Sequence, residues 1–343
     1  MSPFGTSPLW LFSKAVDLSL FLGVAAVSVA VAVLFERLHV SEHSLALWVA
    51  TVLLIDVAHV WSTTFRVYFD APEVARRPVL YWGAPLSVWA VGALLHSVSA
   101  GTFWRALAYL AVWHFVRQQV GFMALYGRQA VDPANVARFD AAAVYAATLG
   151  PVVWWHANLP RAFWWFVEGD FAPGVPSWVG SAGLVASGLI VSAWFSFALT
   201  RPRIPWGKAA LVAATVAAWW VGIVWAPTDV SFTVTNVALH GIPYFYLVHR
   251  ATTARVESGQ GGRFVTRLMA LGPLAFLVIL WSLAFMEEWA WDTLVWHDHS
   301  ALFGTWGVHL APDVAALVVP LLALPQGTHY VLDGFIWKRQ ASA

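Results

Sequence analysis

Long apolar stretches recur along the whole chain, and they limit the folds that it can adopt. Of the 343 residues, 60% are hydrophobic and only 11% are charged. A soluble domain of this size needs far more charge to cover its surface. A run of about 20 apolar residues is the length at which a helix crosses the hydrocarbon core of a bilayer. The chain is therefore predicted to be an all-α, polytopic membrane protein.

Ten spans are predicted, and together they form one helical membrane domain that covers residues 1–343. They are placed near residues 15–35, 44–65, 79–99, 101–126, 137–157, 177–199, 206–226, 230–249, 267–286 and 311–337. The N-terminus lacks a basic start and a small-residue cleavage site, so we expect the first span to be retained.

The basic residues favour one orientation of these spans. Fifteen Lys and Arg, including the C-terminal Lys338 and Arg339, fall on one side. Only Arg37, Arg105 and Arg161 fall on the other side. Because cytoplasmic loops carry an excess of Lys and Arg, both termini are predicted to be cytoplasmic. We expect the chain to lie in a bacterial inner membrane.

Four of the twelve histidines fall at a similar depth in four predicted spans that run in the same direction. They are His59, His114, His240 and His329. Each lies about 10 to 18 residues into its span, which at ~1.5 Å rise per residue is the middle or inner half of the membrane. One imidazole on each of four parallel helices predicts a shared metal site.

Each of these histidines has a polar neighbour three or four positions away on its own helix. The neighbours are Asp56, Gln118, Asn236 and Asp333. Side chains at this spacing share a helix face, as a metal ligand does with a second ligand or an orienting partner. A carboxylate inside a membrane is costly unless it is paired or binds a cation.

Asp56 and Asp333 are the two acidic residues placed well inside spans. They are predicted to be metal ligands, bridges or orienting groups with a catalytic role. Gln118 and Asn236 are predicted to support the bound cofactor. Tyr244, four residues after His240, is a candidate proton donor, with core packing as the alternative.

Other readings of the polar residues stay open. A single intramembrane histidine can join two helices by a hydrogen bond, which contributes about 1 kcal/mol. Arg117, inside a predicted span, can extend its guanidinium to the membrane surface or hold an anionic headgroup. His249 is expected at the surface. A second, outer group of His297, His299 and His309 can bind copper or zinc, or be a polar loop.

The chain has no cysteine, so thiolate ligands are excluded. Imidazole and carboxylate ligands suit iron, zinc, manganese or copper, and with an open position they are typical of non-haem iron that activates dioxygen. We predict a mononuclear or dinuclear iron site. Haem is the rival cofactor, although one histidine per helix at a single depth suits one metal better than two macrocycles.

Single histidines on several helices give the chain its resemblance to a known group. In this respect it resembles the polytopic, histidine-cluster, non-haem-iron membrane enzymes, and among them the Brp/Blh-type carotenoid-cleaving oxygenases. The resemblance implies that His59, His114, His240 and His329 share one iron. The chain lacks the clustered histidine boxes of the desaturases.

The function predicted from these observations is a membrane oxygenase or oxidoreductase. Its substrate would be an apolar lipid, terpenoid or carotenoid that enters from the bilayer, and its partners would be membrane lipids and an electron-donor protein. No nucleic acid is expected. The first alternative is a proton- or cation-coupled transporter, because intramembrane His and Asp also form proton relays and cation sites. The second is a haem-binding redox subunit.

Overall fold

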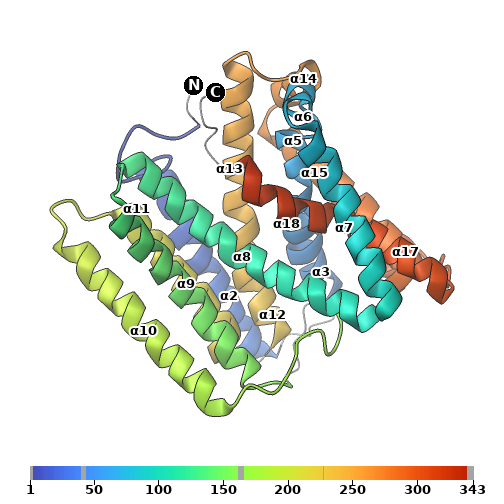
Figure 1. Ribbon diagram of the computed structural model, residues 1–343, viewed down its shortest axis with the longest axis horizontal. Coiled ribbons are helices and arrows are strands. Elements are labelled where there is room, and N and C mark those ends of the chain that lie inside the picture. Colours follow the sequence, from blue (N-terminus) through green and yellow to red (C-terminus); the bar gives the residue numbers. More distant parts are fainter. Residues whose placement is uncertain (1–2, 40–43, 161–165, 227, 338–343) are drawn as a thin grey trace. The chain divides into compact units, whose positions relative to one another are not determined.

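The computed structural model describes residues 3–39, 44–160, 166–226 and 228–337. Every regular element in these ranges is a helix, and they contain no strand (Figure 1). The predicted all-α class is therefore confirmed. Arg161, Lys338 and Arg339, which entered the orientation prediction, lie outside the described residues.

Seven helical segments of the described chain are long and apolar enough to cross a membrane, and one bent pair of helices raises the number to eight. The seven are Lys14–Leu38, Leu45–Arg66, Pro78–Val98, Ala134–Ala157, Ser177–Thr200, Trp206–Trp225 and Pro273–Trp296. The predicted spans 101–126 and 230–249 are helical but are not among them. These two carry His114 and His240, and polar side chains lower the hydropathy of a span.

The chain divides into two compact units. Unit 1 consists of Met1–Pro3, Leu45–Leu107 and Tyr244–Ala343, and unit 2 of Phe4–Ser44 and Ala108–Pro243. Helices α8 (Ala100–Ala130) and α13 (Ala238–Glu257) each contribute residues to both units.

In unit 1, α15 packs against η2 and α4, and α18 packs against α4, α5 and α7. Each of α7, α15 and α17 begins with a proline in its first turn. A backbone N–H at this position has no acceptor within the helix, so a proline there costs no hydrogen bond. The elements of this unit are α3 Leu45–Trp48, η2 Val49–Val57, α4 Ala58–Trp61, α5 Thr63–Arg66, α6 Ala71–Arg76, α7 Pro78–Val98, α14 Arg263–Ala270, α15 Pro273–Trp291, η5 Asp292–Trp296, α16 Ser300–Phe303, α17 Pro312–Leu322 and α18 Leu324–Ile336.

The predicted span 311–337 is broken in the structure. Its halves, α17 and α18, meet at a bend of 42°. Pro325 lies in the first turn of α18, and a proline cannot donate the backbone hydrogen bond that would continue α17 through this point. The second half, α18, carries both His329 and Asp333.

In unit 2, α10 lies along α9, and α11 packs against both α9 and α2. The buried Lys208 of α11 forms ion pairs with Asp132 and Asp140, which ties α11 to the start of α9. The elements are α1 Lys14–Leu18, η1 Ser19–Gly23, α2 Val24–Leu38, α9 Ala134–His156, α10 Ser177–Thr200, α11 Trp206–Trp219, η3 Trp220–Trp225, α12 Asp229–Phe232 and η4 Thr233–Val237.

The η segments are π-helical, with wider turns than an α-helix. Such turns are rare in proteins and occur often at functional sites. Two of them lie directly before predicted site histidines. The segment η2 ends one residue before α4, in which His59 is the second residue, and η4 ends three residues before His240.

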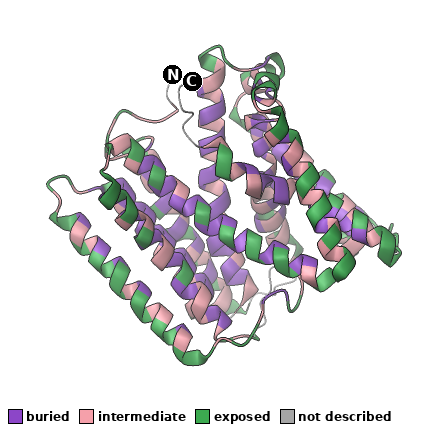
Figure 2. Ribbon diagram, in the orientation of Figure 1, coloured by how far each residue is buried: buried purple, intermediate pink, exposed green. Residues whose placement is uncertain are grey.

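Several helices expose apolar side chains, as lipid-facing helices do. Figure 2 shows α10 as mostly exposed or intermediate along its length. Its exposed residues include Trp178, Val185 and Leu189. A soluble protein rarely exposes a continuous apolar face of this kind, so the surface agrees with a membrane environment.

Candidate metal-binding histidines

His59 and His329 lie together in unit 1. Their ring centroids are 5.0 Å apart, and the rings meet edge to face at 82°. Each side chain is only 1% exposed. His59 comes from α4 and His329 from α18, so the break before α18 and the wide turns of η2 position both rings. These two histidines therefore lie close together, as the sequence predicts.

One nitrogen of each ring faces a polar neighbour. The hydroxyl of Thr63 lies 2.7 Å from Nδ1 of His329, within hydrogen-bond distance. Oδ1 of Asp56 lies 3.6 Å from Nδ1 of His59, which is longer than a hydrogen bond. A partner at Nδ1 orients an imidazole so that Nε2 can bind a metal. Asp56 thus lies where an orienting carboxylate would be.

Tyr244 and Asp333 lie beside this pair. The fully buried Tyr244 ring has its centroid 6.0 Å from that of His59 and 5.3 Å from that of His329. Its hydroxyl donates a 2.7 Å hydrogen bond to Oδ1 of Asp333. The indole of Trp337 donates to the same oxygen at 2.6 Å. Asp333 therefore orients two aromatic side chains, one of which contacts both histidines.

His114 and His240 form a matching pair in unit 2. Their ring centroids are 4.9 Å apart at 82°, nearly the geometry of the first pair. Both are buried. The ring of Phe115 stacks on His240 at 3.7 Å and 7°. Each unit therefore contributes one edge-to-face pair of buried imidazoles.

The two predicted amide residues of unit 2 bond mainly to backbone groups. Gln118 donates a 2.7 Å hydrogen bond to the backbone carbonyl of His240, and Asn236 donates to the carbonyl of Ala218 at 3.2 Å. The side-chain oxygens Oε1 of Gln118 and Oδ1 of Asn236 are buried and have no hydrogen-bond partner within the described residues. Buried acceptors are normally satisfied, so both oxygens are available to a bound water or ligand.

A glycine allows the close approach that places Asn236. A Cβ at Gly222, in η3, would lie 2.2 Å from Oγ1 of Thr235 and 2.7 Å from Nδ2 of Asn236. No side chain fits at those distances, so only glycine lets η3 pack this closely on η4. Sequence reasoning missed Gly222, because nothing in its neighbourhood distinguishes it from other small residues of a span.

Glu287, Glu288 and Asp292 are buried carboxylates that sequence reasoning placed outside the spans. The predicted span ended at residue 286, but α15 and η5 continue to residue 296. Glu287 and Glu288 therefore lie inside a candidate span, in addition to the predicted Asp56 and Asp333. The residues that follow the two glutamates continue the helix to Trp291.

These carboxylates take partners from their own unit. Nε1 of Trp61 donates a 2.6 Å hydrogen bond to Oε2 of Glu287. Asp292 accepts from the backbone N–H of Asp298 and of His299, at 2.9 and 2.8 Å. Asp292 therefore organises the loop that follows η5.

The outer histidines take separate partners. His297 meets His309 edge to face, with centroids 5.2 Å apart. His299 stacks on Trp48 at 4.0 Å, and its Nδ1 lies 3.7 Å from Oδ1 of Asp292. The two imidazoles of the His-x-His sequence thus have different neighbours, as in a polar loop packed between aromatic rings.

Arg117 and His249 lie apart from the buried pairs within their own units. Arg117 is exposed, hydrogen-bonds the hydroxyl of Tyr145, and lies over the ring of Trp113 at 5.8 Å. His249 packs its ring 5.3 Å from that of Phe276. Arg117 therefore has the surface position that a snorkelling arginine takes.

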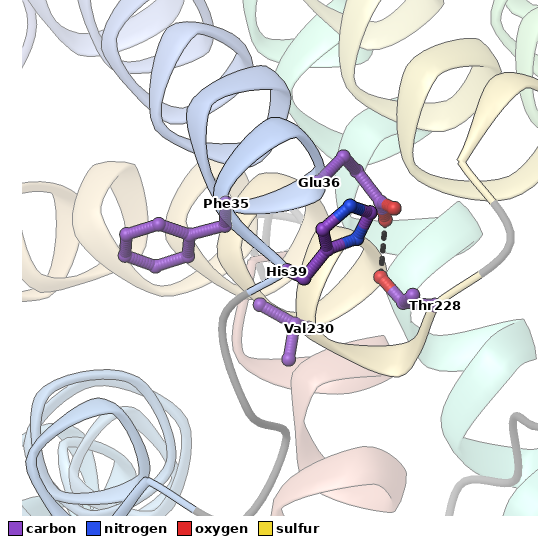
Figure 3. A pocket seen from close by; sticks show the side chains of 5 residues that line it. All are labelled: Phe35, Glu36, His39, Thr228 and Val230. Carbon is purple, nitrogen blue, oxygen red and sulfur yellow. Dashed lines mark hydrogen bonds between the residues drawn. The ribbon is translucent and has the colours of Figure 1, made fainter.

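A small cavity of about 190 Å³ lies at the end of α2 in unit 2. Its lining residues are Phe35, Glu36, His39, Thr228 and Val230. Figure 3 shows Glu36 and His39 close to Thr228, with the ring of Phe35 turned away. Glu36 already accepts hydrogen bonds from Thr228 and from Ser231. None of the four site histidines lines this cavity.

Among the described residues, the four histidines are all buried, and as a set of ligands they are compatible with a metal ion. Imidazole nitrogens alone accept several transition metals, so the ligand set by itself selects no single metal. Comparison with protein-family models, with curated proteins and with solved structures finds no match to this chain.

Proposed function

We propose that the protein is a membrane-embedded, metal-dependent oxygenase or oxidoreductase in which His59, His329, His114 and His240 bind one metal centre. The proposal is based on a pair of buried histidines that occurs once in each unit. Each unit holds two buried imidazoles in the same edge-to-face arrangement, at 5.0 Å in unit 1 and 4.9 Å in unit 2.

The residues present fit a non-haem metal. Thr63 holds Nδ1 of His329, which leaves Nε2 as the ligand nitrogen. The buried amide oxygens of Gln118 and Asn236 would each accept a hydrogen bond from a bound water. Iron, bound in this way with an open position, would supply the activation of dioxygen. Within each pair the rings touch, so no macrocycle fits between them.

The substrate proposed is an apolar lipid, terpenoid or carotenoid, as in the Brp/Blh-type enzymes whose style of site the chain resembles. Cleavage of a C=C bond that takes up both atoms of dioxygen needs no external electrons. Insertion of one oxygen atom into a C–H bond releases the other as water and needs two electrons from a donor protein. The aromatic rings of Tyr244 and Phe115, each beside a histidine of its own unit, would offer apolar surface to such a chain.

A proton- or cation-coupled transporter is the second candidate. The break between α17 and α18 favours it, because discontinuous helices are common at the substrate sites of carriers. Glu287 and Glu288, buried within a span, also suit ion transport.

We also propose ten crossings with both termini cytoplasmic, in a bacterial inner membrane. The distribution of Lys and Arg supports this orientation. Reporter fusions at the C-terminus and after residue 130 test it. Alkaline phosphatase should be inactive and a cytoplasmic fluorescent protein active at both positions, and the reverse would overturn the orientation.

The first test of the function is metal analysis by mass spectrometry with an absorption spectrum, on protein purified in detergent without chelators. We expect stoichiometric iron and no Soret band. His329→Ala and His240→Ala, one from each unit, should both lose the metal. His156→Ala is the control, because this buried imidazole bonds Tyr109 instead. Absence of any metal from the wild-type protein would favour the transporter.

A further inference from the structure

Arg66 ends the apolar segment Leu45–Arg66, and no carboxylate lies within ion-pair distance of it in the described chain. Its side chain is half-buried. Nε is fully buried and has no hydrogen-bond acceptor. An unsatisfied buried donor costs roughly 1–3 kcal/mol, so this guanidinium has unused capacity to bind an acceptor.

The neighbouring arginines of unit 1 differ in this respect. Arg76 pairs with Glu73, and Arg255 pairs with both Asp70 and Glu73. The two carboxylates of this cluster are thus already occupied by the other two arginines. Unlike Arg76 and Arg255, Arg66 therefore has a guanidinium that is available to bind an anion from outside the chain.

Trp337 forms a platform for the guanidinium. Cζ of Arg66 lies 5.4 Å from the centre of its ring, within the range of a cation–π contact. The indole N–H of Trp337 is bonded to Asp333, which also accepts from Tyr244. Arg66 is thus linked through Trp337 and Asp333 to the ring of Tyr244, which lies beside His59 and His329.

Arg66 also lies a short way along the chain from the histidine pair. It is three residues after Thr63 in α5, and Thr63 bonds His329. Three residues of an α-helix rise ~4.5 Å. A group bound at Arg66 would therefore lie about one helical turn beyond the Thr63–His329 contact.

From this arrangement we propose that Arg66 binds the anionic end, a carboxylate or phosphate, of an otherwise apolar substrate whose chain extends to His59 and His329. The proposal rests on the metal-dependent function above and narrows its substrate to an amphiphile. A guanidinium presents two parallel N–H groups that match such an anion. Its place at the end of a span suits a molecule whose charged head stays at the interface while its chain lies in the bilayer.

The test is native mass spectrometry of the detergent-purified wild type, Arg66→Gln and Arg66→Lys, with Arg203→Gln as an exposed control. The probes are palmitate, hexadecyl phosphate, hexadecanol, phosphatidylglycerol and phosphatidylcholine. Wild type should bind palmitate or hexadecyl phosphate at least tenfold more tightly than hexadecanol. Arg66→Gln should lose that preference. Arg66→Lys should keep part of it, because lysine retains the positive charge but lacks the planar guanidinium that binds an anion through two N–H groups.

The same protein samples separate the possible outcomes. Preference for phosphatidylglycerol over both single-chain anions would assign the anion to a membrane lipid rather than to the substrate. Equal binding of palmitate, hexadecyl phosphate and hexadecanol by the wild type would overturn the proposal without any variant. Metal content, measured on Arg66→Gln, should equal that of the wild type. Loss of lipid preference with metal retained supports the anion site, whereas a metal-free wild type would remove the proposed function itself.

Discussion

The hydroxyl of Thr63 lies 2.7 Å from Nδ1 of His329, across helices that are 266 residues apart in the chain. This contact fixes the ring of a proposed ligand from the helix that follows the other histidine of the pair. A substitution of Thr63 therefore tests the role of an orienting group, while a substitution of His329 tests the role of a ligand.

Replacing Thr63 by Val should weaken metal binding without abolishing it. Removal of an orienting partner typically costs 10–100-fold in metal affinity. The measurement is competition with a chelator of known affinity. Thr64→Val is the matched control. The hydroxyl of Thr64 bonds the carbonyl of Trp61, so its removal should leave the affinity unchanged. An equal loss in both variants would show a general effect of the substitution on α5.

Acid should release the metal. Imidazole binds metal only when it is deprotonated, so protons compete with the metal for all four ligands. Apparent affinity should therefore decline as the pH is lowered. Metal content is measured after equilibration at a series of pH values and again on return to neutral pH. Metal content that stays constant down to the pH at which the protein unfolds would contradict histidine ligation.

Gly222→Ala should damage the unit 2 pair. The new methyl group would overlap Thr235 and Asn236, so η4 must move and carry His240 with it. We expect a lower melting temperature and reduced metal content. Gly188→Ala is the control, since a Cβ there meets no atom within 4 Å and alanine favours a helix over glycine by about 1 kcal/mol.

Lys208→Met should destabilise unit 2. The ammonium pairs with Asp132 and Asp140 in a buried site, and removal of one partner leaves a buried charge uncompensated. Losses of about 3–5 kcal/mol are typical of such changes. Thermal unfolding in detergent measures the effect. The exposed Arg203, replaced by Met, should change the melting temperature little.

Much of the fold could be predicted from the sequence. Apolar runs identified the helical class, and the equal depth of the four histidines singled out the residues that the structure places in two pairs. The partners were harder to predict. Gln118 bonds the backbone of His240 rather than completing a helix-face pair with His114, because contacts between helices depend on packing that no local spacing reveals.

The helix ends were the least predictable feature. Glu287 and Glu288 look like the polar end of a span, yet α15 continues past them. Trp61 on another helix satisfies Glu287, and such a distant partner leaves no local mark in the sequence. The break before α18 was easier to anticipate from Pro325, although the proline does not give the size of the bend.

The wide turns of η2 and η4 have a consequence for how this site can vary. Each π-helical turn holds one residue more than an α-helical turn, so it behaves as a local insertion in an otherwise regular helix. A relative could lose that residue upstream of His59 or His240 and keep its imidazole in place, with the difference absorbed in the turn. Any pattern with fixed spacing between a histidine and its polar neighbour would then fail to recognise the shared site, although its chemistry had not changed.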